Sequence, residues 1–115
     1  MIEGLDILED NSAGYHPLVK YEGWRVAVAT LCDNWTEGKV SYVERHMETD
    51  EVFVLLKGKC TLLIGQDRKR CEMETGKVYN VKKAVWHNMI LDEEGLVLIV
   101  ENDNTSKENT EYFYF

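Results

Sequence analysis

Residues 43–54, V-E-R-H-M-E-T-D-E-V-F-V, place several metal-binding side chains within a segment whose other residues favour β-strand. Glu44 and His46 are two residues apart, so on a strand they project from the same face with their Cα atoms about 7 Å apart. Two side chains at this spacing can bind one ion. If the chain turns at residues 47–50, Glu51 returns to the same place as a third donor.

A second strand-like stretch, residues 85–91, supplies another imidazole. His87 alternates in step with Met89 and Leu91, so we expect its ring to point inward among apolar side chains. A buried carboxylate or imidazole without a partner is strongly unfavourable, so such groups need an ion, a counter-charge or a hydrogen-bond network. The sequence contains few cationic side chains that are expected to point inward and balance the negative charge of the glutamates. A divalent metal ion would balance this charge.

Two imidazoles and two carboxylates suit a divalent transition metal, Fe, Mn, Ni or Zn, with positions left open for water or substrate. The four expected metal ligands are Glu44, His46, Glu51 and His87. Alternatives stay open: Glu51 could face water, and Glu44 could pair with a cation or accept a hydrogen bond from a metal-binding histidine. The same residues could also form a metal-free polar pocket. Three residues share the expected inner faces and are either core or pocket lining: Tyr42, Phe53 and Met89.

Period-two alternation, β-branched and aromatic residues and frequent turn residues predict an all-β chain of about eight to ten short strands. Lys57-Gly58-Lys59 is expected to form a compact hairpin turn. Residues 1–20 are weakly patterned, and residues 102–109 are expected to form a loop. The expected strands cover residues 24–31, 40–47, 51–56, 60–64, 71–73, 78–81, 85–91, 96–100 and 111–115.

The chain has 115 residues, which predicts one domain over residues 1–115, with an N-terminal segment at 1–20 and a C-terminal tail at 103–115. A net charge of −8 repels polyanions, so nucleic acid is not an expected partner. A membrane-spanning helix needs about 20 consecutive apolar residues, and every apolar run in the sequence is much shorter. The sequence also has no signal-peptide pattern, so we expect a cytoplasmic protein without a membrane partner. The cysteines fall in no C-x-x-C pair and are expected to be reduced: Cys32, Cys60 and Cys71.

Residues 38–58 resemble the first motif of the cupin superfamily, G-x5-H-x-H-x4-E-x6-G. Every spacing is kept, and the one substitution is glutamate for the first histidine. Because this exchanges a neutral nitrogen donor for an anionic oxygen donor, two carboxylates would neutralise a divalent cation. The five motif positions are Gly38, Glu44, His46, Glu51 and Gly58.

Residues 76–91 resemble the second cupin motif, G-x5-P-x-G-x2-H-x3-N, at Gly76 and His87. The proline, glycine and asparagine of that motif are replaced by Lys82, Ala84 and Leu91. The order of the two motifs and the distance between them make the pair more specific than either one alone.

The resemblance implies an RmlC-like jelly-roll β-barrel, with the four donors at the places where cupins hold their metal. It implies a homodimer and a small polar metabolite as substrate or ligand. Cupins include oxygenases, isomerases, lyases and non-enzymatic binders, so the resemblance selects no reaction. A small-ligand-binding or sensory cupin, or a structural barrel with a degenerate metal site, is the alternative.

Overall fold

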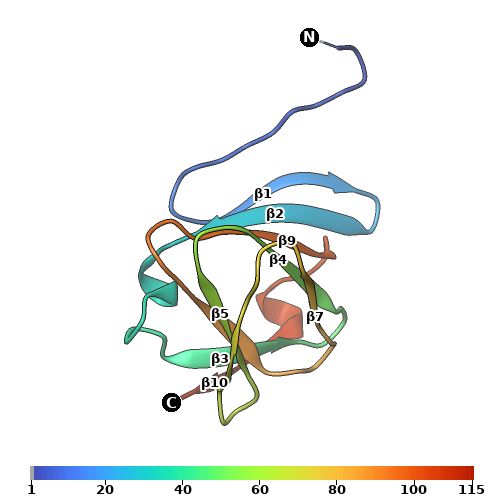
Figure 1. Ribbon diagram of the computed structural model, residues 1–115. Helices are drawn as coiled ribbons and strands as arrows, with labels where there is room; N and C mark the ends of the chain where they lie inside the picture. The colour runs from blue at the N-terminus through green and yellow to red at the C-terminus, as the bar shows by residue number, and fades with distance from the viewer. Residues whose placement is uncertain (1) are drawn as a thin grey trace.

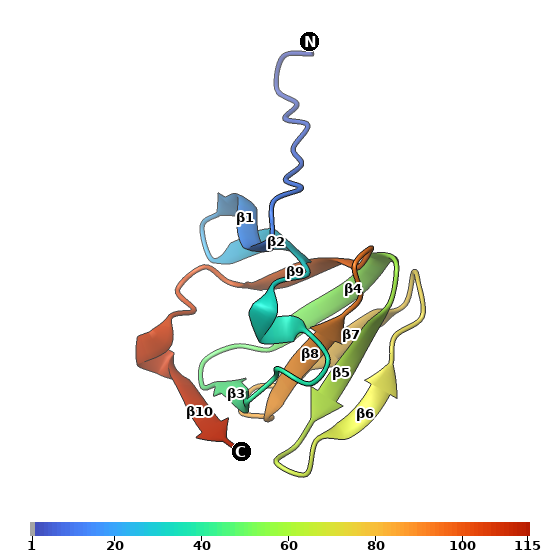
Figure 2. The same ribbon diagram turned by 90° about the vertical axis from the view of Figure 1, so that its left-hand side faces the viewer.

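The structure, a computed structural model, describes residues 2–115. These residues form two five-stranded antiparallel sheets that face each other, as Figures 1 and 2 show from two directions. The architecture confirms the predicted all-β jelly roll. Within residues 2–115 the elements are β1 (Gly14–Tyr21), β2 (Trp24–Thr30), η1 (Asp33–Trp35), β3 (Tyr42–His46), β4 (Glu51–Lys57), β5 (Cys60–Ile64), β6 (Lys69–Glu72), β7 (Val78–Val81), β8 (His87–Leu91), β9 (Leu96–Asn102), η2 (Lys107–Asn109) and β10 (Thr110–Tyr114).

Strands that lie side by side are often far apart in sequence. Sheet A has the order β1-β2-β9-β4-β7, and sheet B has the order β10-β3-β8-β5-β6. The pairing of β3 with β8 sets Glu44 directly opposite His87. The two motif-bearing segments therefore meet in one sheet.

The expected hairpin at Lys57-Gly58-Lys59 is wrong. β4 pairs with β7 and β9 in sheet A, whereas β5 pairs with β6 and β8 in sheet B, so this turn crosses from one sheet to the other. Gly58 has a φ of +71°, and a Cβ there would lie 2.5 Å from the backbone carbonyl carbon of Glu94. A turn signal indicates that the chain reverses, but contacts distant in sequence decide which partner each arm pairs with.

The N-terminal twenty residues include a strand that the sequence pattern did not indicate. β1 lies at the edge of sheet A and pairs with β2, with a register shift between Pro17 and Val19. Proline lacks a backbone N–H donor and is tolerated at such an edge, which explains how a proline-containing segment joins the sheet. The first part of the N-terminal segment, after residue 1, extends away from both sheets (Figures 1 and 2), whereas Ser12 accepts a hydrogen bond from Thr30 of β2.

The C-terminal strand agrees with the prediction. β10 pairs with β3 of the same chain, with Phe113 opposite Val43, so the terminal aromatic segment closes one edge of sheet B. The expected loop before it is shorter than predicted, because β9 continues to Asn102 and η2 follows the N-cap residue Ser106. The division of the chain into one domain with an N-terminal segment and a C-terminal tail stays a prediction.

The turn before β8 holds Ala84, which stands where the second motif has glycine, in an uncommon backbone conformation. β8 begins at His87, two residues later than expected. Ala84 has a φ of +67°, the left-handed conformation that glycine adopts most readily. Alanine therefore adopts here a backbone conformation that favours glycine.

The interior is apolar at one end of the barrel and charged at the other. Along β9, Val97 and Ile99 face the core and the next inward residue is Glu101. β4 and β8 are arranged in the same way. Each has apolar inward residues along most of its length and one buried polar residue at its first position, Glu51 on β4 and His87 on β8. The buried apolar cluster consists of Ala29, Phe53, Leu55, Cys60, Leu62, Met73, Val81, Met89, Leu91, Val97 and Ile99. Among residues 2–115, no helix is both long enough and apolar enough to span a bilayer.

Candidate metal centre

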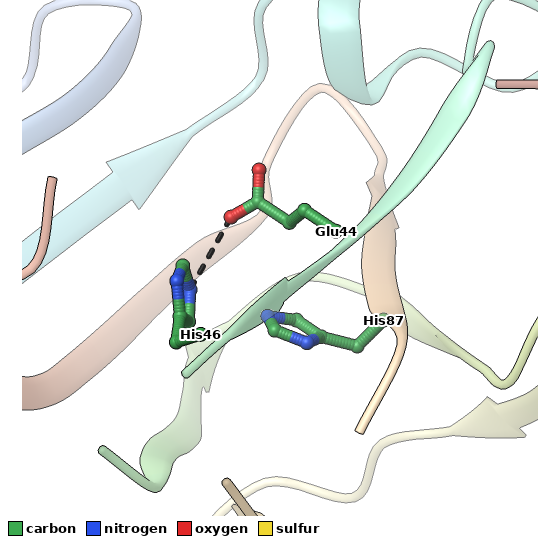
Figure 3. Close-up of side chains that lie close together, drawn as sticks. All are labelled: Glu44, His46 and His87. Atoms are coloured by element: carbon green, nitrogen blue, oxygen red, sulfur yellow. Dashed lines mark ion pairs between the residues drawn. The ribbon is translucent and has the colours of Figure 1, made fainter. Parts of the chain in front are cut away.

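Three strands bring the four expected ligands together at the charged end of the barrel. Glu44 and His46 lie on β3, Glu51 is the first residue of β4, and His87 is the first residue of β8. Figure 3 shows the side chains of Glu44 and His46 on β3 and of His87 on the neighbouring strand, with a dashed line between the Glu44 carboxylate and the His46 imidazole. Both histidines and Glu51 are buried, whereas Glu44 is partly exposed.

The donor atoms are close enough to share one ion. Glu51 Oε1 lies 2.9 Å from His46 Nε2 and 2.8 Å from His87 Nε2. His46 Nε2 lies 3.3 Å from Glu44 Oε2. Adjacent ligands bound to one metal at about 2.0–2.2 Å are about 3 Å apart, so these spacings fit a shared cation. One donor atom from each of Glu44, His46 and His87 lies within 4.8 Å of the other two.

Both imidazole rings are held through their other nitrogen. His87 Nδ1 lies 2.9 Å from the carbonyl oxygen of Val85, which can only accept, so Nδ1 carries the proton. A neutral His87 ring therefore has its lone pair on Nε2, toward the other donors. His46 Nδ1 lies 2.9 Å from the hydroxyl of Thr110. Such outer partners orient metal-binding histidines in known sites.

Without a metal, protons balance the charge of the carboxylates. Burial disfavours the imidazolium form of His46 and of His87, but the hydrogen bonds and negative charge of Glu51 outweigh it and raise the pKa of both rings. Burial also works against the Glu51 carboxylate, yet the two imidazoles hold its pKa well below the usual range. Burial raises the pKa of Glu44. The pocket therefore favours positive charge between these side chains.

A third acidic residue, Glu101, lies beside the four expected ligands and was not among the residues predicted from the sequence. Its Oε2 is 3.9 Å from His46 Nε2, and His46, Glu51 and Glu101 form a second group of donors within 4.8 Å of one another. Its Oε1 accepts hydrogen bonds from Arg25 at 2.6 Å and from Tyr15 at 2.8 Å. Burial, followed by the charge of Glu51, raises the pKa of Glu101 to about 7. The sequence did contain a signal for it. Every second residue of a strand faces the same side, so Glu101 on β9 faces the same side as Val97 and Ile99.

A cavity of about 240 Å³ opens beside these side chains. Tyr42, Phe53 and Met89, the three residues expected to be core or pocket lining, all lie on its wall. Phe53 and Met89 are also part of the buried apolar cluster, and burial raises the pKa of Tyr42 to about 12. The cavity therefore joins the charged cluster to an aromatic and aliphatic wall.

The metal-free protein is expected to lose about 1–3 kcal/mol of stability as the pH rises from about 5 to about 8. The pKa of Glu101 is raised from 4.5 to about 7, so between these values the folded state binds more protons than the unfolded state and stability falls. The imidazole pKa values are raised above 6.5, which continues the loss at higher pH. Urea denaturation of chelator-treated protein across this range measures the trend, and a free energy of unfolding that rises with pH contradicts it.

The chain is similar to known proteins in its structure. No protein-family model matches the chain, and no curated protein matches it. An RmlC-like cupin family protein with a double-stranded β-helix fold from Methanocaldococcus jannaschii is 17% identical, with a TM-score of 0.61, and 89% of this chain and 91% of that chain are covered. FeII HppE is 16% identical, with a TM-score of 0.61 and coverage of 88% of this chain and 62% of that one.

A third similar structure contains a small molecule. It is a variant of Streptomyces PAC13 with uridine, 11% identical, with a TM-score of 0.65 and coverage of 92% of this chain and 83% of that chain. At these identities the similarity concerns the fold alone. The two facing sheets and these structural matches show that the chain has the jelly-roll fold of the cupin superfamily.

Proposed function

We propose that the chain binds one divalent transition metal through Glu44, His46, Glu51 and His87 and that a small polar metabolite binds at this metal. The observation that carries the proposal is the position of Glu51 Oε1, 2.9 Å and 2.8 Å from the Nε2 atoms of two buried histidines. Two imidazoles and two carboxylates suit Fe(II), Mn(II), Ni(II) or Zn(II) and neutralise a divalent charge. The similar structure of FeII HppE supports a metal in this fold.

The metal would act as a Lewis acid that polarises an oxygen of the bound molecule. The protein's own side chains would orient that molecule. Tyr42 and Phe53 contribute aromatic side chains to the cavity wall, and Asn88 and Thr110 are polar residues of the same wall. The volume of about 240 Å³ equals roughly eight water molecules, which favours a small metabolite. PAC13 with uridine is a similar fold with a small ligand.

Metal analysis of the purified protein tests the proposal. Protein prepared without chelators, or stripped and reloaded with Mn(II), Fe(II), Ni(II) or Zn(II), is expected to contain about one metal ion per chain. Loading should also raise the midpoint of thermal unfolding, because an ion that binds only the folded state stabilises it. Protein that retains none of the four metals after reloading contradicts the proposal and favours the structural barrel.

We also propose a homodimer formed through the outer face of sheet A. Phe53 and Ile99 face the core, so the residues that alternate with them on β4 and β9 point outward. These outward residues are apolar, although an exposed sheet face is usually polar. Two identical acidic chains can associate through this uncharged face without bringing like charges together. The outward residues are Val52, Val54, Leu98 and Val100.

Val54→Lys is expected to convert the dimer into a monomer. The substitution places a charge at the centre of the outer face of sheet A. Light scattering coupled to size-exclusion chromatography should give about twice the 13.4 kDa chain mass for the wild type and one chain mass for the variant. Tyr114→Lys, on β10 at the edge of sheet B, is the matched control and should remain dimeric. A monomer from Tyr114→Lys alone would place the interface on sheet B.

The cytoplasm remains the proposed location. The free cysteines Cys32, Cys60 and Cys71 are compatible with a reducing compartment. The net charge of −8 supports the proposed absence of nucleic acid among the partners.

A further inference from the structure

The carboxylate of Glu101 is buried, and only one of its two oxygens accepts hydrogen bonds from the described residues. Its side chain is 4% exposed. Oε1 accepts hydrogen bonds from Arg25 and Tyr15, whereas Oε2 is buried and has no hydrogen-bond partner among residues 2–115. A buried acceptor without a partner is unfavourable and uncommon in folded proteins. While Glu101 is ionised, Oε2 therefore has no hydrogen-bond donor among the described side chains, and a cation would be a suitable partner for it.

The fold directs Oε2 toward the candidate metal centre. β9 pairs with β4 with Val100 opposite Val52, and one residue further along, this register sets Glu101 opposite Glu51. Oε2 is 3.9 Å from His46 Nε2. Glu101 also lines the cavity that contains the four expected ligands. The orphaned oxygen thus points into the space in which an ion would lie.

We propose that Glu101 is a third carboxylate donor of the metal centre and that Arg25 and Tyr15 hold it in place. This inference rests on the proposed metal-binding function and adds a ligand from β9, outside the two segments that carry the cupin motifs. Because Arg25 and Tyr15 bind only Oε1, the other oxygen is left available to the ion.

The charges in the site agree with this assignment. The carboxylates of Glu44, Glu51 and Glu101 carry three negative charges when ionised. A divalent cation and the Arg25 guanidinium, which lies 2.6 Å from Glu101 Oε1, carry three positive charges. Arg25 therefore compensates for the third carboxylate, and a divalent ion balances the other two. A site with three carboxylate donors favours metals that prefer oxygen ligands, such as Mn(II).

Glu101→Gln tests the proposal, because glutamine keeps the shape of the side chain and an oxygen for Arg25 while removing the charge. Mn(II) affinity, measured by competition with a chromophoric chelator, is expected to fall at least about tenfold in this variant. The visible absorption of protein loaded with Co(II) should also change, since it reports the ligands around the ion. Glu111→Gln, an exposed glutamate on β10 that pairs with Arg45, is the matched control and should keep both properties.

Further variants separate failure of this inference from failure of the proposed function. Glu101→Asp keeps the charge but withdraws the oxygens by one methylene, so its Mn(II) affinity should also fall. Wild-type affinity and an unchanged Co(II) spectrum in both Glu101 variants, together with loss of metal from His87→Ala, would overturn the role of Glu101 and leave the metal site intact. A wild type that binds neither Mn(II) nor Co(II) would overturn both proposals. Thermal unfolding of the metal-free variants shows that each is folded before its affinity is compared.

Discussion

His87→Ala is expected to reduce the metal content to below about a tenth of the wild-type value. His87 Nε2 lies 2.8 Å from Glu51 Oε1, at the meeting point of the donors, and the ring is held by Val85. His46→Ala should have the same effect, because its Nε2 is the donor common to both groups of candidate ligands. Elemental analysis of each variant, purified without chelators and then reloaded with Mn(II), provides the measurement.

The third histidine of the chain is the matched control. His16 lies on β1, where its Nε2 is 2.8 Å from the carbonyl oxygen of Ala13, and it is absent from both groups of donors. His16→Ala should therefore retain the wild-type metal content. His87→Gln preserves much of the side-chain volume, so it should leave the fold intact. If this folded variant also loses its metal, the loss is due to the missing imidazole and not to unfolding. Equal metal content in His46→Ala, His87→Ala and His16→Ala would disprove the ligand assignment.

Gly58→Ala is expected to lower the free energy of unfolding by about 4 kcal/mol, a large part of the stability of a domain of this size. Two effects add at this position. The backbone has a φ of +71°, which disfavours any residue with a Cβ. The new Cβ would also lie 2.5 Å from the carbonyl carbon of Glu94 and 2.6 Å from the amide nitrogen of Gly95, and neither backbone atom can move aside cheaply. Urea denaturation measures the change.

Gly76→Ala separates the two effects. Gly76 has a φ of +86°, but a Cβ there would meet no atom within 4 Å. Only the conformational cost applies, so the expected loss is about 1–2 kcal/mol. If both variants lost the same free energy, the close packing of the β4–β5 turn against the β8–β9 turn would not be a source of stability.

Gly58 and Gly76 have similar backbone conformations but different surroundings. Both are motif positions in the sequence, and spacing alone treats them alike. The difference between them comes from Glu94, which lies 36 residues beyond Gly58. Sequence spacing therefore predicts where the backbone turns, and the packed structure decides how much each turn matters.

The amino-acid sequence by itself predicted the all-β class and the shared face of Glu44 and His46, whereas the place of His87 beside them depends on the pairing of β8 with β3. The two predictions follow from local regularities. Strand residues alternate between faces, so Glu44 and His46 must share one, and fixed spacing relates Glu51 to them. The outward position of Arg45, paired with Glu111, follows from the same alternation.

Only the tertiary structure decided which strands pair, and this choice determines the rest of the site. The turn at Gly58 crosses between sheets because β4 finds its partners in β7 and β9. That same pairing brings Glu101 beside Glu51 and, through β2, sets Arg25 opposite Glu101. Alternation says which face a side chain occupies, but the neighbour it meets depends on the register of strands far apart in sequence. The third carboxylate and its arginine partner could therefore be recognised only in the folded chain.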